Sequence, residues 1–159
     1  MNAKTPAKHS VTHNTFTIER VYPVVPAKVF AAFADPKLKG QWFQAPKEWN
    51  NPDVQTMDFR VGGKETSVGG PKGGPVIAYA ATFQDIVANE RIVTTYDMTV
   101  DKKRISVSLS TLELRAEGKG TRLVLTEQGA YLDGSDTGAQ RKEGTEGLLD
   151  ALGTFLTSN

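Results

Sequence analysis

The sequence predicts an α+β domain in which a curved antiparallel sheet of about six or seven strands wraps round one long C-terminal helix. Two observations carry this prediction. Strand-like segments follow one another from about residue 53 to 130 with only short turns between them, which is typical of an antiparallel meander. Leucines then recur on one side of the last twenty or so residues. One face of the sheet must be covered, and only the terminal helix is long enough to cover it.

Two short helices are expected after the first strand. That strand is a β-rich segment at about residues 15–22. Pro26 then opens a helix, since a proline at the first helical position loses no hydrogen bond. Asp35 can cap a second short helix that runs toward residues 42–43.

The remaining elements follow from alternation and from turn residues. Met57, Phe59 and Val61 alternate with polar residues, and a glycine pair at 62–63 ends that strand. Further strands are expected at about 64–68, 76–88, 91–100, 103–115 and 121–129, and the terminal helix at about 137–156.

The hairpin that turns at residues 101–102 sets the register of its two strands. A two-residue turn there places Val107 opposite Tyr96, with Met98 on the same face. We therefore expect these three side chains to face the interior, while Ser106 and its alternate neighbours face solvent.

The next hairpin does not decide which face of the sheet Glu127 occupies. A four-residue loop at 117–120 aligns the strands so that Leu125 faces a leucine, but this phase conflicts with that of the preceding hairpin. A bulge near residues 110–111 would resolve the conflict and turn Glu127 into the interior. Without the bulge Glu127 is a surface charge, and the surface is the more usual place for a glutamate.

A curved sheet that grips one helix leaves space between them, and we predict that this space holds a small ligand. Tyr79, Tyr96 and Tyr131 could fix the orientation of a ligand through their hydroxyls. Gly144 would leave room on the inward face of the helix. Trp49 clusters with aromatic residues at the expected entrance, although such residues could equally pack the short helices on the sheet. The side chains expected to line the space are Phe33, Trp42, Phe43, Tyr79, Tyr96, Met98, Val107, Leu125, Gly144, Leu148 and Leu152.

Composition excludes several classes of function. The 159 residues suit one domain at 14–157 behind a flexible tail at 1–13, with 38% hydrophobic and 23% charged residues. The net charge of +1 argues against nucleic acid as a partner. Cysteine is absent and both histidines lie in or beside the tail, so no metal site, cofactor or nucleophilic triad is expected. With no apolar run of about 18 residues and no signal-like N-terminus, we expect a cytoplasmic protein without membrane contact.

A set of short motifs resembles the activator of heat-shock protein 90 ATPase homologue family, over about residues 14 to 156. The motifs are Glu19-Arg20 with Tyr22, Pro26 to Phe30 with Phe33, Asp35-Pro36, Trp42-Phe43, Asp58 to Gly63, Ile86 to Val93, Gly120 to Leu123 and Thr126 to Gly129. This family is a branch of the START-like (polyketide cyclase/dehydrase and lipid transport) superfamily.

The resemblance implies the helix-grip fold and the binding of an apolar small molecule, because lipids, polyketides and similar molecules are the usual ligands of the superfamily. Two alternatives remain. One is an enzyme of the cyclase or hydrolase kind, with Glu127 or Tyr96 as acid or base; the resemblance itself carries over no catalytic residue. The other is a co-chaperone-like interaction module, which leaves open contact with a chaperone or with a second copy of the chain.

Overall fold

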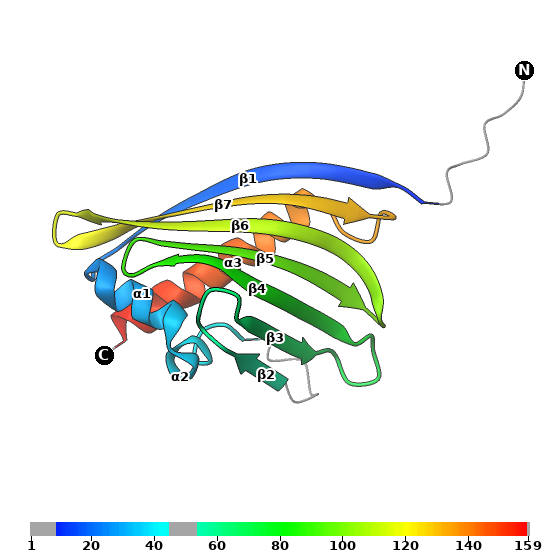
Figure 1. The fold of residues 1–159 in the computed structure, drawn as a ribbon, viewed down its shortest axis with the longest axis horizontal. Helices are drawn as coiled ribbons and strands as arrows, with labels where there is room; N and C mark the ends of the chain where they lie inside the picture. Colours follow the sequence, from blue (N-terminus) through cyan, green and yellow to red (C-terminus); the bar gives the residue numbers. More distant parts are fainter. Residues whose placement is uncertain (1–8, 45–53, 159) are drawn as a thin grey trace, which may run out of the picture.

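The structure, a computed structural model, describes residues 9–44 and 54–158 (Figure 1). Its elements in chain order are β1 (Val11–Tyr22), α1 (Pro26–Ala34), α2 (Pro36–Lys39), β2 (Val54–Met57), β3 (Lys64–Gly69), β4 (Ile77–Val87), β5 (Arg91–Val100), β6 (Lys103–Glu117), β7 (Gly120–Leu132) and α3 (Gly138–Thr157). The expected order of elements is confirmed.

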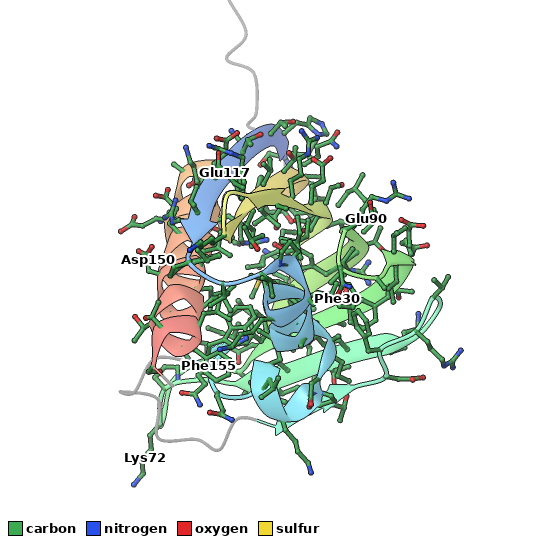
Figure 2. All side chains as sticks on the ribbon, turned by 90° about the vertical axis from the view of Figure 1, so that its left-hand side faces the viewer. Phe30, Lys72, Glu90, Glu117, Asp150 and Phe155 are labelled. Carbon is green, nitrogen blue, oxygen red and sulfur yellow. The ribbon has the colours of Figure 1, made fainter. Side chains whose placement is uncertain are left out.

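All seven strands form one antiparallel sheet in the order β1-β7-β6-β5-β4-β3-β2. Strands from β2 to β7 are joined to their sequence neighbours, while β1 closes the other edge by pairing with β7 along its whole length. Figure 2 shows α1 and α3 within the curve of the sheet, with side chains filling the space between the layers. The predicted helix-grip architecture is therefore confirmed.

The helix starts follow the local signals. Pro26 is the first residue of α1, and the Asp35 side chain accepts a hydrogen bond from the backbone N–H of Lys37 (2.8 Å) to cap α2. Thr137 caps α3 in the same way, accepting from the N–H of Gln140 (3.1 Å).

Two boundaries differ from the predictions. Because β1 begins at Val11, residues 11–13 belong to the sheet and not to a flexible tail. β2 ends at Met57, so the expected alternation through Val61 is wrong: residues 58–63 form a turn. Trp49 and residues 1–8 lie outside the described part of the chain.

The hairpin between β5 and β6 turns where the sequence predicted. Asp101 and Lys102 have φ values of 49° and 69°, as a two-residue turn of this kind requires. The register then shifts by one residue, so that Met98 pairs with Ser106 and Ile105 becomes the extra residue of a bulge.

This bulge reverses the faces predicted for β6. Tyr96 pairs with Ser108 and not with Val107. Ser106 and Ser108 are buried on the inner face, whereas Val107 is 46% exposed on the outer face. The prediction that Val107 lines the interior is wrong, because a shift of one residue moves every side chain of a strand to the other side of the sheet.

The pairing of β6 with β7 agrees with the predicted hairpin. Leu112 pairs with Leu125 and Ser110 with Glu127, and the register between these strands runs without a shift through residues 110–111. The phase conflict is resolved by the bulge at Ile105 instead. Glu127 is only 3% exposed, so the surface position favoured for it is wrong and the inward alternative holds.

The apolar core lies between α1, the C-terminal half of α3 and one half of the sheet. From α3 it receives Leu149, Leu152 and Leu156, all buried, while Leu148 and Phe155 flank this stripe and are partly buried. The burial predicted for Leu152 is confirmed. The other buried members of the core are Phe16, Ile18, Tyr22, Val29, Ala32, Trp42, Phe83, Ile92, Leu112, Leu114, Leu123 and Leu125.

Gly144 does not line the interior. It is exposed, and a Cβ built on it would meet nothing within 4 Å. The inward stripe of α3 runs through residues 141, 145, 149, 152 and 156, and position 144 falls beside it.

Candidate functional site

The inner face of the sheet has an apolar half and a polar half. On β6, leucines at 112 and 114 give way to small polar side chains at Ser106 and Ser108. On β7, leucines at 123 and 125 give way to Glu127 and, beyond Gly129, to Tyr131. The first turns of α3 cover this half of the sheet and bring Arg141 against Tyr96 and Ser106.

Arg141 reaches into this polar half from α3 and is 9% exposed. Its Nη1 donates to the hydroxyl of Tyr96 (2.9 Å), and its Nη2 donates to Ser106 Oγ (2.7 Å) and to Asp136 Oδ2 (2.8 Å). The guanidinium also lies 5.6 Å from the ring centroid of Tyr96 and 5.4 Å from that of Tyr131. Arg141 is thus held from several sides in one position.

Glu127 is the buried carboxylate of the cluster. The Tyr96 hydroxyl donates to its Oε1 at 2.7 Å, whereas its Oε2 and the hydroxyl of Tyr131 have no hydrogen-bond partner within the described residues. Burial raises the pKa of Glu127; the hydrogen bond from Tyr96 and the charge of Arg141 counteract part of this increase, and the charge of Asp136 adds to it.

The hydroxyl of Tyr96 stays protonated, because burial and then the neighbouring Glu127 raise its pKa well above 10. It therefore acts as a donor to Glu127 while it accepts from Arg141. Gly129 makes room for the third tyrosine: a Cβ at this position would lie 3.0 Å from the Tyr131 hydroxyl and 3.2 Å from Ser108 Oγ. The Tyr131 side chain accordingly leans back along β7, toward Glu127.

Aromatic side chains form a continuous row that leads to this cluster. Ring centroids are 4.9 Å apart for Phe33 and Trp42, 5.8 Å for Trp42 and Phe43, 5.7 Å for Phe43 and Tyr79, and 4.9 Å for Tyr79 and Tyr96. All five were expected to line the interior, and the structure brings them together from α1, the segment after α2, β4 and β5. We call them the aromatic row.

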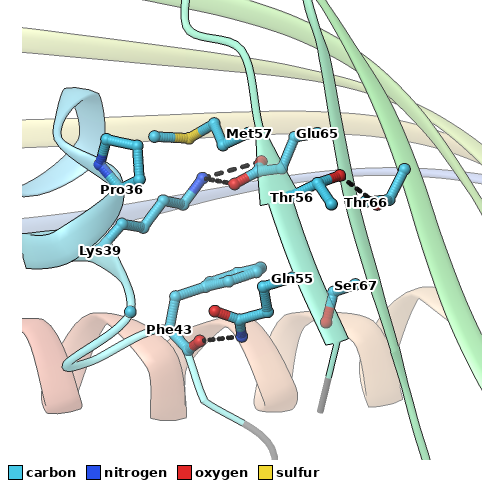
Figure 3. A pocket seen from close by; sticks show the side chains of 10 residues that line it. Pro36, Lys39, Phe43, Gln55, Thr56, Met57, Glu65, Thr66 and Ser67 are labelled. Atoms are coloured by element: carbon cyan, nitrogen blue, oxygen red, sulfur yellow. Dashed lines mark hydrogen bonds and ion pairs between the residues drawn. The ribbon is translucent and has the colours of Figure 1, made fainter.

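A pocket of about 140 Å³ opens beside the aromatic row at Phe43 (Figure 3). At its wall Lys39 Nζ lies 2.6 Å and 2.9 Å from the two carboxylate oxygens of Glu65 and 4.7 Å from the ring centroid of Phe43. The Tyr79 hydroxyl donates to Glu65 Oε1 at 3.3 Å. The lining residues are Pro36, Lys39, Gly40, Phe43, Gln55, Thr56, Met57, Glu65, Thr66 and Ser67.

The other predicted lining residues have different positions. Met98 lies on the inner face beside the polar half, partly buried. Leu125, Leu148 and Leu152 belong to the apolar core and its margin. Trp42 is buried and its indole N–H donates to a backbone carbonyl of α1 (2.9 Å), so it also fastens the helix, as the packing alternative proposed.

Sequence reasoning missed Arg141, Ser106 and the pair of Lys39 with Glu65. Arg141 carried a usable signal, because it lies eight and eleven residues before two core leucines of α3 and so shares their helical face. The inward position of Ser106 could not be predicted because it depends on the bulge at Ile105. The ion pair could not be predicted because Lys39 and Glu65 lie on separate elements of the chain.

The sequence from residue 23 to 157 matches the family described as "Activator of Hsp90 ATPase homolog 1-like protein". The chain belongs to this family. The START-like helix-grip fold described above agrees with this membership.

Two solved structures resemble this family member along nearly its whole length. An uncharacterised protein from Rhizobium leguminosarum is 40% identical with a TM-score of 0.89, and the match covers 95% of this chain and 99% of that one. Protein Mll3558 from Rhizobium loti is 47% identical with a TM-score of 0.84, covering 92% and 99%. Protein CV1439 from Chromobacterium violaceum, 22% identical with a TM-score of 0.75 over 92% and 99%, shares the fold. A search of curated proteins finds no match.

Within residues 9–44 and 54–158, no group of three or more histidine, aspartate or glutamate side chains could hold a metal ion. No described helix is long and apolar enough to cross a membrane.

Proposed function

We propose that this protein binds a small, largely apolar molecule between the sheet and α3, and that the ligand enters through the pocket beside Phe43. One observation carries the proposal: within the aromatic row, Phe43 at the pocket wall contacts Tyr79, and Tyr79 contacts Tyr96, which belongs to the buried polar cluster with Glu127 and Arg141. Apolar walls with a few convergent polar groups are the usual composition of small-molecule sites.

The size of the pocket supports a ligand with a narrow apolar part. An apolar cavity of about 150 Å³ accommodates benzene, and the pocket here measures about 140 Å³. It can therefore take one ring or a short alkyl chain against Phe43 and Met57, while a longer ligand would extend along the aromatic row.

The experiment combines native mass spectrometry of the purified protein, to detect a retained small molecule, with calorimetric titration of 1-octanol. We expect binding of octanol that Met57→Trp weakens by filling the pocket. The matched control is Val61→Trp, which adds the same side chain at a 59% exposed position outside the pocket and should leave binding unchanged. No retained molecule together with no octanol binding would refute the proposal.

A hydrolase- or cyclase-type enzyme is the second candidate, and the raised pKa of the buried Glu127 favours it, because acid–base groups are tuned in this way. 4-Nitrophenyl butyrate serves as a probe substrate. Hydrolysis that Glu127→Gln abolishes would support this candidate, and hydrolysis that is absent or unaffected by the substitution would count against it.

A further inference from the structure

We propose that the ligand carries a cationic hydrogen-bond donor, an amine, and that Glu127 Oε2 accepts it in the polar half of the interior. This inference rests on the proposed function and specifies the polar end of the same ligand. It follows from a comparison of the polar groups of the cluster that already have hydrogen-bond or ion-pair partners with the one that does not.

Arg141, the cation of the cluster, is already engaged. Its two terminal nitrogens donate to Tyr96, Ser106 and Asp136, with a longer contact of 3.4 Å to Ser108. An anionic ligand head would have to replace these bonds and would also approach two carboxylates. The cluster is therefore a poor site for a fatty acid or another carboxylate.

Glu127, in contrast to Arg141, has no ion-pair partner of its own among the described residues. Arg141 forms its ion pair with Asp136, and Lys39 forms one with Glu65, so each cation near the aromatic row has its own carboxylate. Glu127 receives one hydrogen bond, from a neutral hydroxyl to Oε1. Its Oε2 has no partner among the described residues, although the residue is only 3% exposed. A buried ionised carboxylate requires a second donor or a counter-charge.

Charged side chains of β1, β5, β6 and β7 outside the cluster are paired with one another or with α3. On β1, Arg20 lies 3.2 Å from Asp150 and 3.9 Å from Glu146 of α3. On the neighbouring strands the pairs are Asp97–Arg104 of β5, Glu113–Arg115 of β6, and Arg122 of β7 with Glu117 and Glu19. The charges that act on the pKa of Glu127 are those of Arg141 and Asp136. A ligand amine would supply the missing positive charge.

A short chain of side-chain contacts links the pocket wall to Glu127. The Tyr79 hydroxyl contacts Glu65 at the pocket wall (3.3 Å), its ring lies 4.9 Å from that of Tyr96, and the Tyr96 hydroxyl contacts Glu127 (2.7 Å). Two tyrosine rings thus separate the pocket from the carboxylate. A slender molecule with its apolar part in the pocket and along these rings would bring its head to the polar half.

The experiment compares octylamine, 1-octanol and octanoate, which share one alkyl chain and differ in the head group, by calorimetric titration at pH 8. We expect octylamine to bind about tenfold more tightly than octanoate, with octanol between them; a tenfold ratio corresponds to about 1.4 kcal/mol. Glu127→Gln should remove the preference for the amine. The control Glu113→Gln, which removes a carboxylate on the outer face of β6, should keep it.

A pH series on the unsubstituted protein provides a second readout. Because its pKa is raised, Glu127 takes up a proton at a higher pH than an exposed glutamate would, and the preference for octylamine over octanol should shrink as the pH is lowered. Two results would overturn this inference: octanoate that binds at least as tightly as octylamine, or a preference for the amine that remains in Glu127→Gln. In either case the binding of octanol would still support the proposed function. A failure of octanol itself to bind would overturn both.

Discussion

Replacing Arg141 by methionine should destabilise the protein strongly, because this guanidinium holds the polar half of the interior together. Methionine keeps the apolar length of the side chain but leaves Asp136 without its ion-pair partner and Tyr96 and Ser106 without a donor. Both members of the ion pair are largely buried, with side-chain exposures of 9% and 17%. Removing one partner of such a pair costs about 3–5 kcal/mol, which for a domain of this size lowers Tm by about 6–20 °C.

The loss should also depend on pH through Glu127. The charge of Arg141 lowers the pKa of Glu127, so without it the folded-state pKa rises further above the unfolded value. When the pKa of an acid is higher in the folded state than in the unfolded state, the acid costs no stability at a pH below its unfolded-state pKa. The free energy of unfolding then decreases as pH rises from the unfolded-state pKa to the folded-state pKa. The cost of Arg141→Met should therefore be larger at pH 8 than at pH 5, and adding Glu127→Gln should recover part of it at pH 8.

Urea denaturation followed by circular dichroism measures both effects. The matched control is Lys142→Met, which removes the neighbouring, exposed charge of the same helix and should change stability by less than about 0.5 kcal/mol. A cost below about 1 kcal/mol at both pH values would show that Arg141 is not paired as described.

Three further predictions concern single substitutions, each measured by the same denaturation. Glu127→Gln should stabilise the protein at pH 8 by about 1.4 kcal/mol for each pH unit by which the folded pKa exceeds the unfolded one, and the gain should shrink toward pH 5 as the native glutamate takes up its proton. Leu152→Ala, at a fully buried core position, should cost about 2–5 kcal/mol, and Leu148→Ala, partly buried one turn earlier, should cost less. Gly144→Ala should stabilise α3 by up to about 1 kcal/mol, whereas Gly63→Ala should destabilise, since a Cβ there would overlap the carbonyl oxygen of Asp58.

Each of these has a contrary result that is easy to recognise. A gain from Glu127→Gln that is equal at pH 5 and pH 8 would place the carboxylate in solvent. Equal losses for Leu152 and Leu148 would contradict the buried stripe of α3. A loss of stability in Gly144→Ala would mean that this glycine packs closely against another element.

The strands, the turns and most of the helix boundaries could be predicted because their signals are local. Pro26, Asp35 and the two-residue turn at 101–102 act through their own backbone geometry, and all three function as expected. The bulge at Ile105 has no comparable local signal. Ser106 and Ser108 face the interior and Val107 faces outward, contrary to the apolar pattern of the sequence. Assigning the more apolar set of alternate residues in this part of β6 to the inner face was therefore wrong.

The same reason explains the incomplete prediction of the site. The aromatic residues of the row were predicted as a group, since large apolar side chains near a sheet that grips a helix tend to meet in its interior. Arg141 and Glu127 are charged, and charged residues are ordinarily exposed. Both bond to the same buried hydroxyl, that of Tyr96, which lies 45 residues from Arg141 and 31 residues from Glu127 in the chain.

The sequence by itself determined the helix-grip fold, the family and the aromatic character of the interior, because alternation, turn chemistry and helical periodicity act over a few residues and add up along the chain. Only the tertiary structure decided that Val107 faces outward, that Gly144 lies in solvent and that Glu127 is buried beside Tyr96. These outcomes depend on one extra residue in a strand pair and on the rotation of one helix against the sheet. Both are set by the packing of the whole domain, which no local pattern records.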